Sequence, residues 1–237
     1  MKIATKLILG LAQLADFTSD FVDLFDRHNQ LMYGYTKNKT RLRDQLTSLL
    51  SVGFIDKKVK GGKIFYRVTS QGFSNLYIDL PVYRFSSVRW DKLWRIVIYD
   101  IPEEYRIMRQ KLQYKLKSLS FGQWQKSVWV TPHPIIPYIR EFLISNKMED
   151  YCQVYEARNL YGDSKELANN IWKLEELNFK YKELFVKIKK IKEDKEIKKV
   201  LKDFELLLFS DPGLPQELLP KIWYGSWVQK EIFKKFK

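Results

Sequence analysis

Residues 36–72, TKNKTRLRDQLTSLLSVGFIDKKVKGGKIFYRVTSQG, decide the fold of the N-terminal part of this 237-residue chain. Their first half predicts a helix that begins near Thr36, because four leucines recur at the spacing of one buried helical stripe. These leucines are Leu42, Leu46, Leu49 and Leu50. Gly53 marks the end of this helix, and two strand-like runs then flank Gly61-Gly62, a pair suited to a two-residue hairpin turn. A helix followed by a β-hairpin is therefore expected over this stretch.

The same stretch carries a large part of the positive charge of the chain. Residues 36–69 contain nine Lys or Arg and two acidic residues, a balance of +7, whereas the whole chain has a net charge of +14. Lysine and arginine bind DNA phosphates and base edges, and small hydroxyl side chains allow a helix to lie deep in the major groove. We therefore predict that this surface binds double-stranded DNA. The predicted DNA-binding residues are Lys37, Lys39, Thr40, Arg41, Arg43, Asp44, Lys57, Lys58, Lys60 and Lys63.

Two further helices are expected before this stretch. Apolar residues recur at helical spacing from Ile3 to Leu14, which predicts an amphipathic helix, and capping residues predict a second helix from about Asp20 to Leu31. Three helices followed by a basic hairpin resemble a winged helix-turn-helix, which we place at residues 1–78. The phrases LLSVGFI at 49–55 and VTSQG at 68–72 add to this resemblance. The winged helix also serves as a protein-interaction module, so a role confined to protein contacts stays open.

The middle of the chain alternates between strand and helix patterns. Residues 79–88 are expected to form a linker, because Leu80-Pro81 and Ser86-Ser87 interrupt the periodic segments. Strand–helix–strand–helix–strand then predicts a ferredoxin-like domain, which we place at residues 89–160. The expected strands are 93–99, 127–130 and 151–155, and the expected helices are 108–119 and 134–144.

The C-terminal part, residues 161–237, is expected to be helical. Apolar spacing predicts one long helix over 164–191, a second over 197–209 and a short final helix that contains Trp223 and Trp227. The basic run from Lys182 to Lys199 alternates with acidic residues, which is typical of a solvated helical face. The expected fold class is α+β, with a winged helix, a ferredoxin-like α/β sandwich and a helical C-terminal domain.

Three phrases in this order resemble the PaaX family of transcriptional repressors: WRIVIYDIPE at 94–103, FGQWQKSVWV at 121–130 and DPGLPQELLP at 211–220. The resemblance covers essentially the whole chain. It implies a homodimeric repressor of three domains, which we expect to dimerise through the ferredoxin-like domain. In the best-known members an aryl-coenzyme A thioester releases the protein from DNA. The lysine-rich stretch at 187–199 is more basic than the family pattern, so the aryl-thioester effector is not carried over to this chain. The expectation is kept to a small-molecule effector of the acyl-coenzyme A kind, and the basic stretch could hold its phosphates, extend the DNA contacts or do neither.

A second resemblance supplies a rival hypothesis. The middle domain is similar to small CRISPR-associated ferredoxin-fold nucleases, whose first strand ends in a metal-binding aspartate at the position of Asp100. Two such carboxylates across a dimer axis could hold a divalent metal that activates water against a phosphodiester. The structural alternative is that Asp100 caps the helix expected after Pro102. A third hypothesis is a nucleic-acid scaffold without sequence preference that uses only the basic surfaces.

Ordinary enzyme chemistry finds little support in the sequence. It contains no phosphate-binding glycine loop, serine nucleophile elbow or metal-spaced cluster of His and Cys. His28 and His133 fall in different expected domains and are interpreted as structural or surface residues, and Cys152 as a buried apolar side chain. We therefore expect no enzyme activity and no cofactor. No run approaches the roughly 18 apolar residues of a membrane span, so a soluble, cytoplasmic protein is expected.

Overall fold

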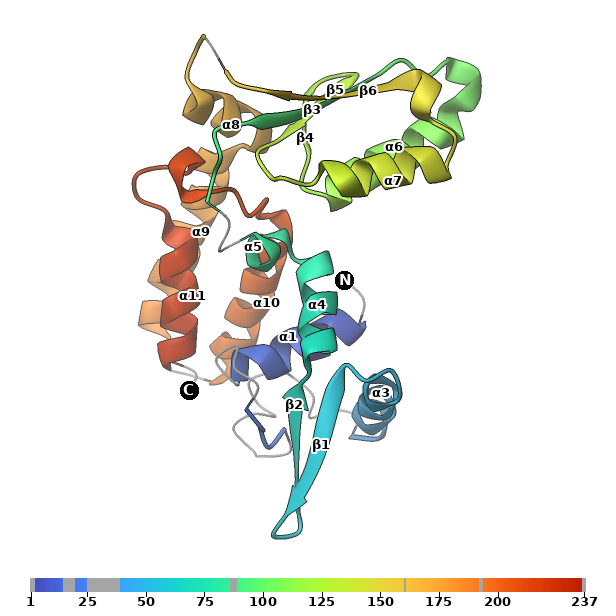
Figure 1. Ribbon diagram of the computed structural model, residues 1–237. Helices are drawn as coiled ribbons and strands as arrows, with labels where there is room; N and C mark the ends of the chain where they lie inside the picture. The colour runs from blue at the N-terminus through green and yellow to red at the C-terminus, as the bar shows by residue number, and fades with distance from the viewer. Residues whose placement is uncertain are drawn as a thin grey trace. The chain divides into compact units, whose positions relative to one another are not determined.

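The computed structural model describes residues 3–14, 20–24, 39–85, 89–159, 161–191 and 194–235. The chain divides into two compact units. The first unit comprises Met1–Leu80, Asn178–Ser210 and Trp223–Lys237, and the second comprises Pro81–Leu177 and Asp211–Ile222. Helices and antiparallel sheets are both present, which confirms the α+β class (Figure 1). The expected domain boundaries at residues 78, 88 and 160 remain predictions.

Helix α1 (Ile3–Leu14) lies in the interior of the first unit. All six residues from Leu7 to Ala12 are buried, so the middle of this helix is covered on every side and not only along one stripe. The expectation of an amphipathic helix was therefore wrong, although the helix itself is confirmed. Its neighbours include α4 (Ser70–Asp79) and strand β2 (Lys63–Val68). Burial of the apolar residues in its middle stabilises the helix.

A helix and a hairpin form the basic part of the first unit. Helix α3 (Lys39–Ser51) is followed by β1 (Ile55–Lys60) and β2, which pair antiparallel from Ile55 with Val68 to Lys60 with Lys63. Residue Val22 forms an isolated antiparallel bridge with Tyr66 of β2. The expected helix start at Asp20 was therefore wrong, because residues 20–24 are not helical. The rest of that expected helix, 25–31, lies outside the described residues.

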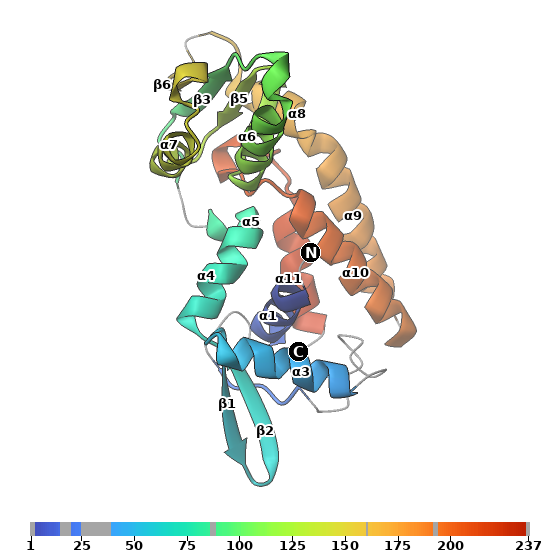
Figure 2. The same cartoon turned by 90° about the vertical axis from the view of Figure 1, so that its right-hand side faces the viewer.

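Three helices from the C-terminal part complete the first unit: α9 (Leu174–Lys190), α10 (Asp194–Ser210) and α11 (Tyr224–Lys235). Only the first turn of α9 belongs to the second unit. Helices α9 and α10 lie side by side (Figure 2). Aromatic rings join α9 to the segment around α11, with Tyr181 against Trp223 at 5.6 Å and Phe185 against Trp227 at 5.9 Å. The expected helical C-terminal region is confirmed.

The long helix expected over 164–191 is divided in two. Helix α8 (Ser164–Trp172) ends at Lys173, which has a left-handed backbone with φ of 54°, and α9 begins at the next residue. A left-handed residue ends a helix because its carbonyl and amide no longer point along the helix axis. Lysine rarely adopts this conformation, so the sequence carried no sign of the break.

The second unit contains a four-stranded antiparallel sheet in the order β4-β5-β3-β6. Its strands are β3 (Trp94–Tyr99), β4 (Gly122–Gln125), β5 (Val128–Thr131) and β6 (Cys152–Ala157). Helix α6 (Arg106–Ser118) joins β3 to β4, and α7 (Ile136–Ser145) joins β5 to β6. This β-α-β-β-α-β order is that of a ferredoxin-like fold, as expected. Strand β4 was missed because it is short and its side chains after Gly122 are exposed.

The two faces of this sheet have different partners. Helices α6 and α7 cover one face, where Val97, Tyr99 and Trp129 form part of the main core of the unit (Figure 1). On the other face, α8 packs over β4, and a Cβ atom on Gly122 would lie only 2.2 Å from Ile171. The Trp172 ring of α8 stacks on Trp94. Helix α8 therefore covers one end of the second face. In the described part of the chain, no helix is long and apolar enough to cross a membrane.

Candidate nucleic-acid interface

Helix α3 presents a polar side opposite its buried leucines. Leu42, Leu46 and Leu49 are buried, as their spacing predicts, and Leu50 is half-buried. Thr40, Arg43 and Asp44 are exposed. Lys39 and Arg41 belong to the helix, but their side chains lie outside the described part, as does the whole of Lys37. The described face of α3 is thus short, polar and open to solvent, as a helix that enters a DNA groove requires.

The end of α3 is joined closely to the hairpin and to α4. Gly53 has a positive φ of 71°, and the amide of Phe54 donates a hydrogen bond to the Leu49 carbonyl at 3.0 Å. The Thr69 hydroxyl donates to the Gly53 carbonyl at 2.7 Å and accepts from the Gly72 amide at 3.1 Å. A Cβ atom on Gly72 would lie 2.1 Å from the Phe54 carbonyl oxygen, so only glycine fits there. These contacts explain the phrases LLSVGFI and VTSQG.

The hairpin turn has the geometry that its two glycines predict. Gly61 and Gly62 have φ values of 58° and 72°, so both central residues are in the left-handed region of a type I′ turn. Lys60 and Lys63 face each other across the turn, and Lys58 lies on the same face of the hairpin two residues before Lys60. Lys57 is on the opposite face. All four lysines are exposed, and the hairpin tip is positive on both faces.

Several hairpin cations already have partners within the protein. Lys63 lies 3.9 Å from the Asp23 carboxylate, and Arg67 forms an ion pair with Asp56 at 2.8 Å. The Phe21 ring lies beneath two cations, with the Arg67 guanidinium 4.8 Å and the Lys58 ammonium 5.7 Å from its centroid. The segment 20–24 therefore holds part of the hairpin in place.

Lys57 and Lys60 differ from these neighbours. Within the described residues, neither has an ion-pair or aromatic partner. An exposed lysine without a partner keeps its charge available for a phosphate and loses no internal contact when it binds one. Lys57 and Lys60 are therefore the hairpin residues best placed for contact with a polyanion.

Helix α3 and the hairpin share one electrostatic environment. Burial raises the pKa of the Tyr66 hydroxyl in β2, and the positive charge of Arg43 on α3 partly opposes that rise. Arg43 is therefore close enough to β2 for its charge to act there. Sequence reasoning identified Arg43 but missed Phe21 and Asp23, because it assigned residues 20–31 to a helix. Their contribution depends on a strand pairing between residues far apart in the sequence.

Asp100 does not have the surroundings of a metal ligand. It is exposed at the end of β3, and its backbone amide donates to the Tyr151 carbonyl at 2.9 Å. The described residues contain no group of three or more His, Cys, Asp or Glu that could hold a metal ion. The nuclease hypothesis thus gains no support. The capping role was also wrong, because neither the turn at Glu103–Tyr105 nor α6 has a side-chain cap.

The histidine and cysteine of the second unit are buried. His133 stacks on Phe85 with ring centroids 3.6 Å apart, and burial lowers the pKa of its imidazole to about 3. Burial raises the pKa of the Cys152 thiol to about 11, which makes this cysteine an unreactive apolar side chain. His133 is therefore neutral and structural. His28 lies outside the described residues.

Comparisons with known proteins match two successive parts of the chain. Residues 87–169 match the PaaX protein central Cas2-like domain, and residues 172–237 match the PaaX-like protein C-terminal domain. The chain belongs to the PaaX family. The PaaX resemblance found in the sequence is thereby confirmed for the middle and C-terminal parts of the chain. This family is generally one of transcriptional regulators.

One solved structure shares the fold of this PaaX-family chain along nearly its whole length. It is described as an uncharacterized protein, Rv0674, from Mycobacterium tuberculosis, with a TM-score of 0.59 and 19% sequence identity. The match covers 98% of this chain and 94% of the other. At this level of identity the likeness shows the fold alone. No curated protein matches the chain.

Proposed function

We propose that this PaaX-family protein is a sequence-specific repressor that binds double-stranded DNA through a winged helix-turn-helix in its first unit. One observation carries the proposal: the exposed polar face of α3 adjoins a hairpin whose Lys57 and Lys60 have no partner among the described residues. A helix flanked by a basic hairpin is the arrangement that reads a major groove and holds the adjacent phosphates.

The two parts of this interface have different roles in the proposal. Helix α3 lies in the major groove, where Thr40, Arg43 and Asp44 reach base edges. The hairpin lies along the backbone, where Lys57 and Lys60 bind phosphates. Base contacts determine which sequence is bound, and phosphate contacts strengthen binding to all sequences alike.

The proposed repressor is a homodimer that binds an inverted repeat, with one α3 helix in each of two successive major grooves. The sheet of the second unit supports a second copy of the chain as partner. Beyond the area covered by α8, its outer face exposes Ile98, Trp124 and Tyr155 by 40%, 49% and 48%. Ile98 of β3 and Tyr155 of β6 lie on the same face as the half-buried Ile96, and Trp124 is exposed at the bulge of β4. A two-fold axis through such a face pairs it with itself.

Fluorescence anisotropy with the DNA immediately upstream of the gene for this protein tests the proposal. Binding that survives scrambled competitor DNA and weakens steeply with salt is the expected result. Arg43→Ala should lower the preference for that DNA over scrambled DNA, by about 1–3 kcal/mol if Arg43 reads a base. Arg140→Ala removes an exposed arginine of the second unit and is the matched control. Equal binding to both DNA sequences would refute specific repression and favour the scaffold hypothesis.

The proposed repressor also responds to a small molecule of the acyl-coenzyme A kind, which releases it from DNA. The family supports regulation but names no ligand for this chain. Adding acyl-coenzyme A compounds one at a time to the bound complex tests this part. A loss of anisotropy with one compound at micromolar concentration is expected, and no loss with any of them would refute an effector of this kind.

A further inference from the structure

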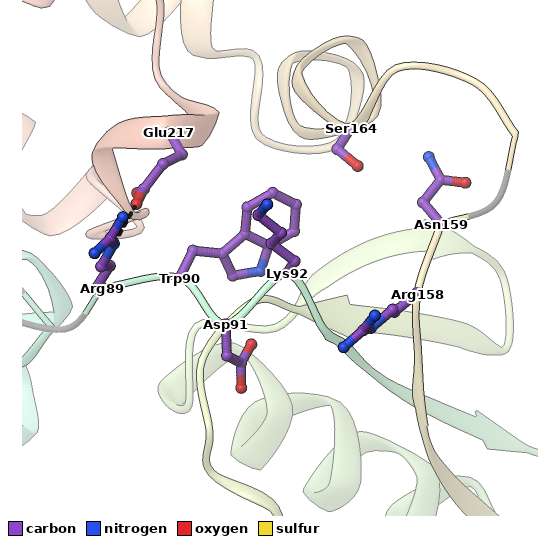
Figure 3. A pocket seen from close by; sticks show the side chains of 8 residues that line it. All are labelled: Arg89, Trp90, Asp91, Lys92, Arg158, Asn159, Ser164 and Glu217. Carbon is purple, nitrogen blue, oxygen red and sulfur yellow. Dashed lines mark ion pairs between the residues drawn. The ribbon is translucent and has the colours of Figure 1, made fainter.

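The second unit contains a cleft of about 540 Å³ that none of the preceding roles uses. Its lining comes from the segment before β3, from the segment after β6, from the first residue of α8 and from the turn at Gln216–Leu218 (Figure 3). The lining residues are Arg89, Trp90, Asp91, Lys92, Arg158, Asn159, Ser164 and Glu217. A cleft of this volume has the size of a small-molecule site.

Each acidic residue of the cleft has an arginine partner. Asp91 accepts hydrogen bonds from the buried Arg95, at 2.8 Å to one guanidinium nitrogen, and this contact holds the pKa of its carboxyl below the usual range. Arg95 also binds Glu156 at 2.9 Å, so its side chain is fixed on two sides. The Glu217 carboxylate lies 3.8 Å from Arg89. Asp91 and Glu217 are therefore each engaged by an arginine other than Arg158.

Two of the cleft cations are available to a ligand. Within the described residues, Lys92 and Arg158 have no ion-pair partner. They approach the cleft from different segments, and the Arg158 guanidinium points inward in Figure 3. The hydroxyl of Ser164 also points into the cleft (Figure 3). The amide end of α8 is not counted, because the Asp163 side chain already accepts from the Lys165 amide.

An aromatic surface lies between these polar groups. The Trp90 indole occupies the middle of the cleft in Figure 3, and its N–H donates to the Leu93 carbonyl at 3.1 Å. The Trp94 ring lies 5.6 Å from it with the ring planes 66° apart, and Trp90 is only half-buried, so part of the indole is accessible to another flat group. The cleft therefore combines two unpaired cations, a hydroxyl donor and a fixed indole.

We propose that this cleft binds a small organic anion in which a phosphate or carboxylate is joined to an aromatic ring. Arg158 and Lys92 bind the anionic group, since a guanidinium and an ammonium are the side chains that compensate its charge. The ring stacks on Trp90. The role of this ligand as a regulator rests on the proposed function. Binding of the ligand to the cleft does not require DNA and can be measured without it.

Isothermal titration calorimetry of the full chain without DNA tests the site with four probes: phenyl phosphate, benzoate, AMP and inorganic phosphate. The ring-bearing phosphates should bind at least about fivefold more tightly than inorganic phosphate, because stacking on an indole adds to the ionic contacts. Tighter binding of AMP than of phenyl phosphate indicates a nucleotide ligand, and the reverse order indicates a smaller aromatic anion. Absence of binding by all four probes at millimolar concentration would overturn the proposal.

Two variants with matched controls identify the residues. Lys92 has a positive φ of 65°, which asparagine tolerates, so Lys92→Asn removes the charge without new backbone strain. Lys147 is also exposed with a positive φ of 53°, and Lys147→Asn is its control. Arg158→Ala is compared with Arg140→Ala. Each cleft variant should weaken binding of the tightest probe by about tenfold or more, and each control should leave it unchanged.

The outcomes separate this inference from the proposed function. Equal losses in cleft and control variants would refute the site. If Lys92→Asn and Arg158→Ala weaken binding to duplex DNA but not to the small anions, the cleft is a DNA contact and the proposed ligand is wrong. Retained ligand binding by a protein that fails to bind DNA would refute the repressor while the site stands.

Discussion

Replacing Lys57 and Lys60 together by alanine should change how DNA affinity depends on salt. Both lysines are exposed on the hairpin, and neither has a partner among the described residues, so the double variant breaks no internal contact. Each phosphate contact contributes about −0.9 to the slope of log affinity against log salt concentration. Loss of both contacts should therefore make the slope less steep by about 1.8.

The expected effect can be stated for one salt change. A rise from about 50 to 200 mM salt, a factor of four, should weaken the double variant about 12-fold less than it weakens the parent protein. The loss of affinity at low salt should be the same for upstream and scrambled DNA, because phosphates are present in every sequence. Anisotropy titrations at four salt concentrations measure both quantities.

The control is the double replacement of Lys111 and Lys117, which are exposed on α6 in the second unit. It changes the net charge by the same amount and should leave the slope as it is in the parent protein. An unchanged slope in the Lys57 and Lys60 variant, or an equal change in the control, would refute the assignment of these lysines to phosphates.

Three further predictions concern stability and assembly. Gly72→Ala should destabilise the first unit by about 1–3 kcal/mol in urea unfolding, because its Cβ would overlap a backbone carbonyl. The control is Gly61→Asn in the open turn, which should change stability by less than about 0.5 kcal/mol. Ile98→Glu should convert a dimer to a monomer in sedimentation velocity. The control Ile107→Glu, at an 82% exposed position on α6, should leave the dimer intact. A monomeric parent protein would refute this interface. The pKa of His133 is about 3 in the folded state and about 6.5 in the unfolded state. Between these pH values only the unfolded state binds a proton at this residue. The free energy of unfolding should therefore fall by about 1.4 kcal/mol per pH unit from pH 6 to 4. His133→Gln should lack this part of the pH dependence, and an identical pH profile in both proteins would show that the imidazole is accessible to protons.

Sequence periodicity was most reliable where the structure is local. The leucine stripe of α3 and the Gly61-Gly62 turn depend on residues within a few positions of each other, and both were predicted correctly. The ferredoxin-like domain was recognised from only three of its strands, because the alternation of strands with helices already limits the possible sheet orders. Strand β4 lacked an apolar pattern and became apparent only through its pairing with β5.

Predictions failed where a distant partner decides the conformation. Asp20 was expected to start a helix, but Val22 pairs with Tyr66, and no local pattern announces that bridge. Helix α1 was expected to be buried along one side only, but α4 and β2 lie against it and its middle is buried on every side. The residues of α1 do not by themselves show which elements will pack around it. The break at Lys173 was missed for a different reason, because lysine rarely adopts the left-handed backbone that ends α8 there.

The sequence by itself determined the family, the α+β class and the location of a basic helix and hairpin in the N-terminal part. Charge, apolar periodicity and turn-forming residues are local properties of the sequence, so they can be identified without knowledge of the tertiary structure. Only the tertiary structure decided which cations are occupied, since ion pairs such as Lys63 with Asp23 join residues 40 positions apart. It also brought Lys92, Arg158 and Trp90 around one cleft, because β3 and β6 are neighbours in the sheet although they are distant in the chain.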